Sequence, residues 1–328
     1  MTINHLVLCG GGPIGIVQYG ILKKLSQENI IKLDEITSIY TTSVGGFIAF
    51  IYMLNFDWEC MDDFIIKRPW ENLFKFGISD YLNIFYTKGL ISINTLIEAL
   101  KPLYLAKNIP IDITMHDFYE LTNINFNLVS CNLNTFTKQL LNHNTTPDLK
   151  VYEAIYMSLT IPILFQPFYY NNNYYLDGGI FVNCPTNDCI YHELCTPDYE
   201  NLLVITNDRR EQIDPSNEFY KNDDVTNNDT LNKESNFFEY IIYIFKTLFN
   251  KIALIENENS IEICNSINTC LHSSLVHLKY WHFVFTDKQE REHLIKLGTI
   301  QAEKYIRKLN AVTPTPIIDT SLNNISCD

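Results

Sequence analysis

The chain has 328 residues, of which 46% are hydrophobic, and carries a formal net charge of −14. That charge argues against nucleic-acid binding, which needs basic patches, and against electrostatic adsorption to anionic lipid, so any membrane contact should be mainly apolar. No uninterrupted apolar run reaches the roughly eighteen residues of a membrane span, and the first residues lack the features of a signal peptide. We therefore expect a cytoplasmic protein that can lie peripheral to membranes.

The first half of the sequence alternates short apolar runs with helical patterns, as in a parallel sheet covered by helices. Residues 5–9 predict a strand that ends in three glycines, and residues 15–29 predict a helix. A second strand over 35–40 leads through a sharp turn at 41–45 into a buried, wholly apolar helix over 46–54.

Later segments complete one α/β domain over residues 1–310, followed by a flexible tail over 311–328. A polar, acidic stretch at 207–236 lacks periodicity and predicts a loop insertion within that domain. The other predicted elements are mostly helix over 58–121, a hairpin of strands 125–130 and 137–141, a helix over 148–159, strands 202–206 and 282–286, and an apolar helix over 237–255.

The glycine turn after the first strand is the first candidate for chemistry. Gly10, Gly11 and Gly12, followed by Gly15, present backbone N–H groups at the positive end of a helix, where a phosphate or a developing oxyanion would bind. The second strand does not end in the acidic residue of a dinucleotide site, and the Gly-Lys-Ser/Thr of a P-loop is absent. An oxyanion is therefore the favoured ligand.

Ser43 and Asp177 are the candidate reacting residues. A strand, then Ser43 with Gly45 two residues on, then a buried helix has the layout of a nucleophile elbow, although Thr41 replaces the usual first glycine. An ordinary helix N-cap is the alternative for this serine. An aspartate held beside a serine by a glycine turn, as Asp177 is by the glycines after it, can accept the hydroxyl proton directly.

Four blocks in this order resemble the patatin-like phospholipase family. They are Gly10 to Gly15, Thr42 to Gly46, Ser158 to Pro167, and Asp177-Gly178-Gly179 with Asn183 and Pro185. The resemblance spans roughly residues 5–206 and extends to a helix over 294–309. It implies a three-layer α/β/α fold with a mainly parallel central sheet.

The resemblance also implies a serine acyl hydrolase that cleaves fatty-acyl esters of glycerolipids, of the phospholipase A or lysophospholipase type. Ser43 and Asp177 would form a catalytic dyad, and Gly10, Gly11 and Gly12 would form the oxyanion hole. Gly15, Gly45, Gly178 and Gly179 would support these motifs. The partners would be a glycerolipid or phospholipid substrate and, transiently, a membrane surface, with no cofactor, metal or nucleic acid.

Four alternatives stay open at this stage. Because Thr41 could crowd the turn, the chain could be a catalytically degenerate lipid-binding relative. A Ser-His-Asp triad could recruit one of His272, His277 and His282. The spacing of Cys184, Cys189, Cys195 and His192 is irregular for zinc, and free thiols in a reducing compartment fit better. Residues 237–255 could pack in the core or meet the lipid surface as a lid.

Overall fold

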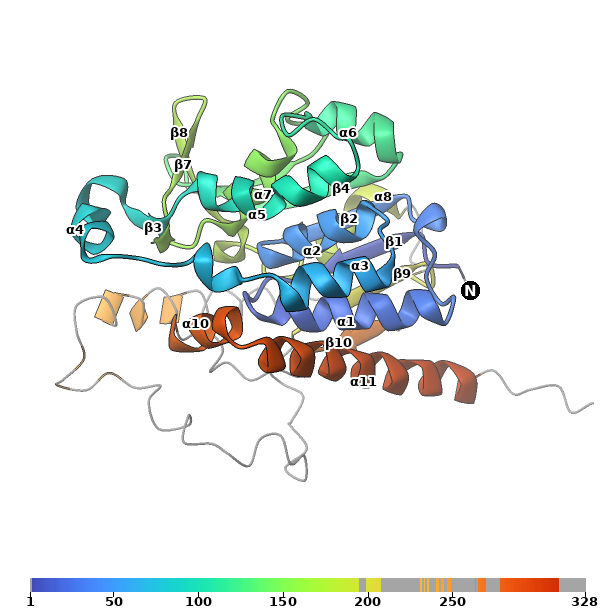
Figure 1. Cartoon of the computed structure of the whole chain (residues 1–328). Coiled ribbons are helices and arrows are strands. Elements are labelled where there is room, and N and C mark those ends of the chain that lie inside the picture. The colour runs from blue at the N-terminus through green and yellow to red at the C-terminus, as the bar shows by residue number, and fades with distance from the viewer. Residues whose placement is uncertain are drawn as a thin grey trace, which may run out of the picture.

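A computed structural model describes residues 2–194, 199–207, 263, 265–269 and 278–312, together with a few positions between 231 and 248 (Figure 1). The helices and strands in chain order are β1 (His5–Leu8), α1 (Ile14–Gln27), β2 (Ser38–Thr42), α2 (Val44–Met53), α3 (Trp58–Asp62), α4 (Ile78–Thr87), β3 (Gly89–Ile91), α5 (Ile93–Ala106), α6 (Met115–Thr122), β4 (Asn125–Asn132), β5 (Thr137–Leu141), α7 (Val151–Leu159), β6 (Ile163–Phe165), β7 (Phe168–Tyr170), β8 (Asn173–Asp177), α8 (Thr186–Glu193), β9 (Leu202–Thr206), β10 (Ser266–Asn268), α10 (Leu278–Thr286) and α11 (Lys288–Val312).

The central sheet is mixed but mostly parallel. Its strand order is β10-β9-β1-β2-β4-β8-β7, and β5 pairs with β4. Strands β10, β9, β1, β2 and β4 run parallel, whereas β5 and β8 run antiparallel to β4. The predicted hairpin of strands 125–130 and 137–141 is therefore confirmed as β4 and β5. A separate parallel pair, β3 with β6, lies outside this sheet.

Alternating side chains of β1 pack into two different cores, one on each face of the sheet. Leu6 and Leu8 of β1 belong to the larger core, with residues of α1, α2, α7 and α11. Val7, between them, packs on the other face with Cys189 of α8. This period of two is what a sheet buried on both sides requires, and it confirms the three-layer α/β/α architecture (Figure 1).

Helix α11 lies along α1 at a distance that only glycine permits (Figure 1). A Cβ atom at Gly20 of α1 would lie 2.3 Å from the carbonyl oxygen of Ile295. A Cβ atom at Gly298 of α11 would lie 2.2 Å from that of Val17. The two backbones are thus in direct contact, and this contact attaches the C-terminal helix to the layer that carries the glycine turn.

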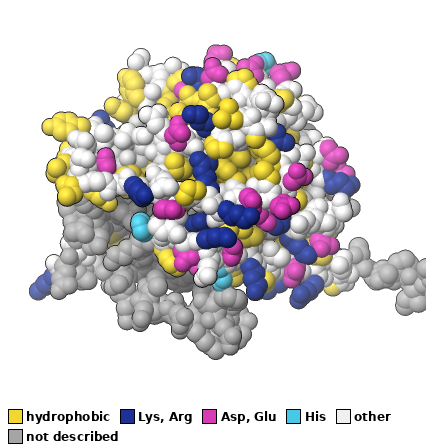
Figure 2. All heavy atoms as spheres, viewed as in Figure 1, with side chains coloured by type: hydrophobic (Ala, Val, Ile, Leu, Met, Phe, Trp, Pro, Cys, Tyr) yellow, Lys and Arg dark blue, Asp and Glu magenta, His cyan; other side chains and the backbone are white. Residues whose placement is uncertain are grey.

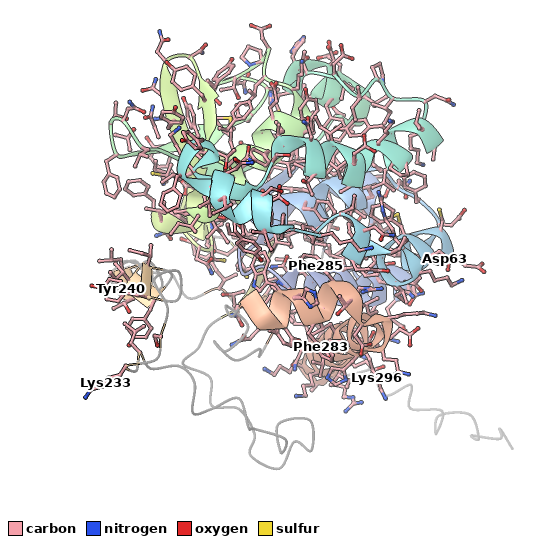
Figure 3. All side chains as sticks on the ribbon, turned by 60° about the vertical axis from the view of Figure 1, so that its left-hand side comes forward. Asp63, Lys233, Tyr240, Phe283, Phe285 and Lys296 are labelled. Atoms are coloured by element: carbon pink, nitrogen blue, oxygen red, sulfur yellow. The ribbon has the colours of Figure 1, made fainter. Side chains whose placement is uncertain are left out.

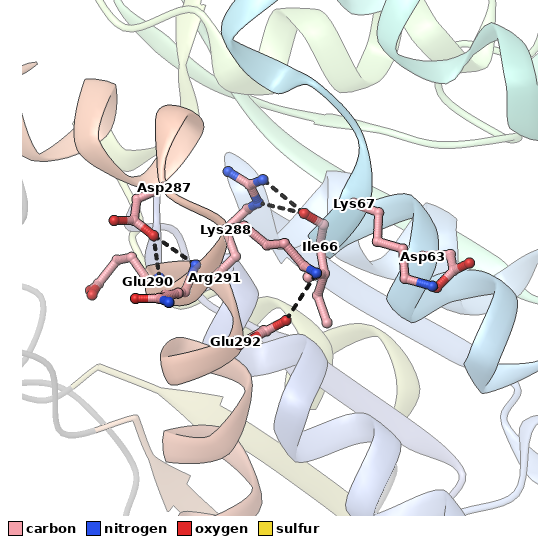
Figure 4. Close-up of polar contacts among 9 residues, drawn as sticks. Asp63, Ile66, Lys67, Asp287, Lys288, Glu290, Arg291 and Glu292 are labelled. Carbon is pink, nitrogen blue, oxygen red and sulfur yellow. Dashed lines mark hydrogen bonds and ion pairs between the residues drawn. The ribbon is translucent and has the colours of Figure 1, made fainter.

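Arg291 fixes the junction between α10 and α11 (Figure 4). Its buried guanidinium group donates hydrogen bonds to the carbonyl oxygens of Val284 (2.7 Å) and Phe285 (2.9 Å) at the end of α10. It also donates to Ile66 O (2.7 Å), in a short π-helical turn that follows α3. One cation therefore satisfies the final carbonyls of one helix and ties it to a distant turn.

Residues 282–286, predicted as a strand, belong to helix α10, so that prediction was wrong. Val284 is buried, and the rings of Trp281 and Phe285 pack on each other with centroids 6.4 Å apart. These three residues have the i, i+3, i+4 spacing of a helix, which a short apolar run conceals.

Other predictions fall partly outside the described residues. These are the loop over 207–236, most of the helix over 237–255, and the tail beyond Val312, where α11 ends. None of the helices in the described part of the chain combines the length and the apolar character needed to cross a bilayer.

We expect Gly298→Ala to destabilise the fold by about 1–3 kcal/mol, because the added methyl group must push α11 away from α1. Thermal unfolding followed by circular dichroism measures the change. Lys296→Ala, at an exposed position of the same helix, is the matched control and should leave the midpoint nearly unchanged. Equal midpoints for the two variants would contradict the tight contact.

Candidate active site

The glycine turn and Ser43 lie side by side because β1 and β2 are neighbouring parallel strands. Parallel strands end at the same edge of a sheet, and α1 and α2 each begin at that edge. A Cβ atom at Gly15 would lie 2.5 Å from Val44 Cγ2, so the first turns of the two helices are in contact. Two positive helix ends therefore point at one place.

Ser43 has a strained backbone, as the proposed nucleophile elbow requires. Its φ of 54° and ψ of −127° are rare for a residue with a side chain. Its N–H donates to Ser158 Oγ (2.8 Å), and Ser158 Oγ donates to Val129 O (2.6 Å), so two buried hydrogen bonds hold this conformation. Ser43 occupies the N-cap position of α2, but its side chain makes no capping hydrogen bond to that helix.

Thr41 is accommodated inside β2. It is fully buried, it is not among the residues with positive φ, and its hydroxyl donates to Asn127 O of the neighbouring strand (3.0 Å). The added volume is offset by Gly46, where a Cβ atom would lie 3.3 Å from Thr41 Oγ1. The elbow therefore forms with threonine at a position where a glycine was expected.

Asp177 ends β8, on the far side of β4 from Ser43. The chain then crosses β4 at Val129 so closely that a Cβ atom at Gly178 would lie 2.2 Å from the Val129 carbonyl oxygen. This crossing carries the aspartate toward β2, and a Cβ atom at Gly179 would lie within 3.9 Å of the Thr42 side chain. The two residues proposed to react thus come from strands separated by one other strand.

The pKa of the Asp177 carboxyl group is raised by its surroundings. Burial raises its pKa to about 6, while hydrogen bonds from the Ser43 hydroxyl and the Gly179 N–H act in the opposite direction. The Gly179 bond to Oδ1 is 2.7 Å long. The buried Oδ2 has no partner of strict hydrogen-bond geometry among the described residues, so the Ser43 contact is looser than a full hydrogen bond.

The three glycine N–H groups of the turn differ in whether they already donate a hydrogen bond. The Gly10 N–H already donates to Asn183 O (2.8 Å). Gly11 and Gly12 have φ values of 146° and 59°, and neither N–H donates to any residue in the described ranges. Two free amides at the start of a helix can hold an anion or a developing oxyanion. Asn183 serves instead to hold the turn in place.

Trp281 of α10 covers this turn, which the sequence did not indicate. A Cβ atom at Gly12 would lie 2.2 Å from Trp281 Cζ2. On the same helix, Phe285 lies toward the body and stacks on Phe74 with ring centroids 3.9 Å apart, whereas Phe283 lies on the opposite side and is exposed (Figure 3). Helix α10 thus forms an aromatic wall beside the site.

The described residues do not supply a histidine for a Ser-His-Asp triad. His282 is exposed on α10, and within the described ranges no histidine hydrogen-bonds to Ser43 or Asp177; His272 and His277 lie outside them.

The residues suggested as zinc ligands do not lie together as a metal site among the described residues. Cys189 packs in the core that contains Val7, and His192 stacks on Tyr40 with ring centroids 6.4 Å apart. Where the structure is described, no three His, Cys, Asp or Glu side chains gather as metal ligands do, and Cys195 lies outside that part.

Comparison with known proteins decides the family. The family model described as patatin-like phospholipase matches residues 6–190, more than half of the chain. The chain belongs to the patatin-like phospholipase family. Its fold is also similar to the crystal structure of VipD from Legionella pneumophila, with a TM-score of 0.50 and 16% identity over 94% of this chain and 67% of that one.

Two viral relatives extend the comparison. This patatin-like chain is 32% identical over 196 residues to "Probable lipid hydrolase 463L" of Invertebrate iridescent virus 6, covering 57% of this chain and 63% of that relative's length. It is 23% identical over 307 residues to "Uncharacterized protein R571" of Acanthamoeba polyphaga mimivirus, covering 94% of this chain and 95% of that relative.

Asp177→Asn should stabilise the fold at neutral pH. Because burial raises the pKa from 3.8 to about 6, the folded chain binds this proton more tightly than the unfolded chain, and stability falls as pH rises through that window. Removing the buried charge should add on the order of 1–3 kcal/mol at pH 8 and nearly nothing at pH 3.5. Chemical denaturation at both pH values measures this. A gain of the same size at both would show that the charge is not its cause.

Proposed function

We propose that the protein is a serine acyl hydrolase that cleaves fatty-acyl esters of glycerolipids, of the phospholipase A or lysophospholipase type. The observation that carries the proposal is the meeting of a strained serine, a buried aspartate and two free glycine amides at one edge of the sheet. Membership of the patatin-like phospholipase family and the printed name of the iridescent virus relative support a lipid ester as the substrate.

In the first half of the reaction, Ser43 Oγ attacks the ester carbonyl carbon while Asp177 accepts the hydroxyl proton. The carbonyl oxygen becomes an oxyanion and accepts hydrogen bonds from the N–H groups of Gly11 and Gly12. The tetrahedral intermediate then breaks its bond to the alcohol oxygen, which takes the proton from Asp177 and leaves as the lysolipid or glycerol product. The acyl group stays on Ser43 as an ester.

In the second half, a water molecule attacks the acyl carbon and passes its proton to Asp177. The glycine amides stabilise the second tetrahedral intermediate as they did the first, a contribution of about 3–4 kcal/mol per donor in comparable sites. Collapse of that intermediate releases the fatty acid and returns the proton from Asp177 to Ser43 Oγ. No redox partner or metal is needed for the atoms and charges to balance.

A fluorophosphonate probe should label the wild-type protein at Ser43. We expect Ser43→Ala to abolish labelling and Asp177→Asn to slow it by about 10²–10⁴-fold, because the base is lost while the fold is kept. Ser79→Ala, at an exposed position, is the control. In-gel fluorescence against time measures the rates. Labelling that persists in Ser43→Ala would overturn the nucleophile, and a folded but unlabelled wild type would favour a lipid-binding relative without turnover.

The rate should rise with pH and level off, with a midpoint near 6, because Asp177 must be unprotonated to accept the Ser43 proton. Initial rates on a short-chain nitrophenyl ester between pH 4.5 and 8.5 give the profile of kcat/KM. His282→Ala should leave the midpoint in place. A midpoint that moves in that variant would point to a histidine base instead.

A further inference from the structure

Helix α4 turns its apolar side away from the protein. Ile84 is its one buried residue, at 7% exposure, although most of its side chains are large and apolar. The exposed ones, called here the α4 face, are Ile78 (83%), Tyr81 (48%), Leu82 (65%), Phe85 (77%) and Tyr86 (83%). Their spacing places them on one side of the helix. A contiguous apolar face of this kind marks an interaction surface.

The α4 face lies at the same end of the molecule as the candidate site. Helix α4 runs directly into β3, and β3 pairs with β6, with Gly89 opposite Ile163. The residues just before β6 hold the site: Ser158 Oγ accepts from the Ser43 N–H, and Thr160 O accepts from the Asp177 N–H (2.9 Å). In Figure 2 hydrophobic side chains gather at the left-hand edge, where Figure 1 shows α4.

Charge is scarce on this helix. Its only charged residue is Asp80, whose carboxylate accepts a hydrogen bond from the Gly77 N–H (2.7 Å) and so belongs to the helix start. Just beyond the helix, the Lys88 ammonium lies 5.6 Å from the centre of the Tyr174 ring, and Tyr174 in turn contacts the exposed Tyr169. Tyrosine rings and one lysine side chain therefore form the rim of the face.

We propose that the α4 face docks the protein on the uncharged surface of a glycerolipid bilayer. Leucine, isoleucine and phenylalanine would enter the boundary between headgroups and acyl chains, and Tyr81 and Tyr86 suit the headgroup level. A chain with a net charge of −14 gains nothing from anionic lipid, so an apolar contact is the mode open to it. The inference that docking delivers substrate to Ser43 rests on the proposed function. The docking itself is independent of that function.

A second copy of the chain fits this face less well. Stable protein interfaces engage roughly 20–30 residues on each side, whereas α4 is a projecting helix of ten residues with five exposed apolar side chains. A narrow, convex, apolar strip with tyrosine rings and one lysine at its rim matches a fluid lipid surface, which closes around it.

The test is flotation with dioleoylphosphatidylcholine vesicles, comparing the full chain with Leu82→Asp/Phe85→Asp. We expect the double variant to lose about tenfold or more in partitioning, because two acidic side chains cannot enter the apolar boundary. The matched control is Leu121→Asp/Tyr191→Asp, which changes one exposed leucine and one exposed aromatic residue on α6 and α8, away from α4 (Figure 1). It should bind like the wild type.

Hydrolysis of the same vesicles and of a short-chain nitrophenyl ester, measured in parallel, separates docking from chemistry. The double variant should lose about tenfold more activity on vesicles than on the ester. If no protein hydrolyses either substrate but the difference in flotation remains, the proposed function fails and the docking stands. Equal flotation of the wild type and the double variant, or none by the wild type, overturns the docking whatever the rates show.

A more conservative substitution tests the docking without the risk that the aspartate variant fails to fold. Phe85→Trp keeps the face apolar, and its fluorescence should be quenched by vesicles of bromine-labelled phosphatidylcholine more strongly than that of Leu121→Trp. Equal quenching in the two variants would overturn the docking. A wild-type dimer in light scattering that the aspartate pair abolishes, together with no flotation, would overturn it in favour of self-association.

Discussion

The candidate site depends on backbone segments that approach one another more closely than any side chain would permit. A Cβ atom at Gly45 would lie 2.5 Å from Leu8 O, and one at Gly178 would lie 2.2 Å from Val129 O. The first contact seats α2 on the end of β1, and the second lets the chain cross β4 so that Asp177 comes toward Ser43. With Gly15 against Val44, these contacts set the geometry on which the proposed chemistry relies. The glycines of the motifs thus permit these close backbone contacts because they lack side chains, in addition to any role of their N–H groups.

The charges of the site favour moving negative charge from one place to another. Burial disfavours the ionised form of Asp177, which is why its pKa rises to about 6. In the proposed reaction the serine proton neutralises this carboxylate at the moment when the oxyanion forms. The new charge would lie at the starts of α1 and α2, where amides and helix ends stabilise it. A carboxylate that is costly in the resting state and an oxyanion that is well solvated by the protein would both lower the barrier.

The sequence predicted most of the fold because short-range patterns carried it. Strand 202–206 has the predicted bounds, and the Ser43 turn lies between a strand and a helix as expected. What it did not predict depends on partners far away in the chain. The Gly10 N–H is occupied by Asn183, 173 residues later, and nothing near Gly10 indicates this. Trp281 was missed for a related reason: the residues directly after it, 282–286, were predicted as a strand, so no helix was expected to bring it onto the glycine turn.

Helical periodicity shows that a helix has an apolar side but not which way that side faces. The composition predicted a mainly apolar membrane contact, and the sequence left open whether the apolar helix over 237–255 packs in the core or makes that contact. Residues 78–87 read simply as part of a helical region. Only their burial distinguishes them, since an ordinary amphipathic helix buries its apolar stripe, whereas this one buries Ile84 and exposes the rest. In the proposed docking, this apolar surface beside the candidate site would bring the proposed ester chemistry to the bilayer that holds the substrate.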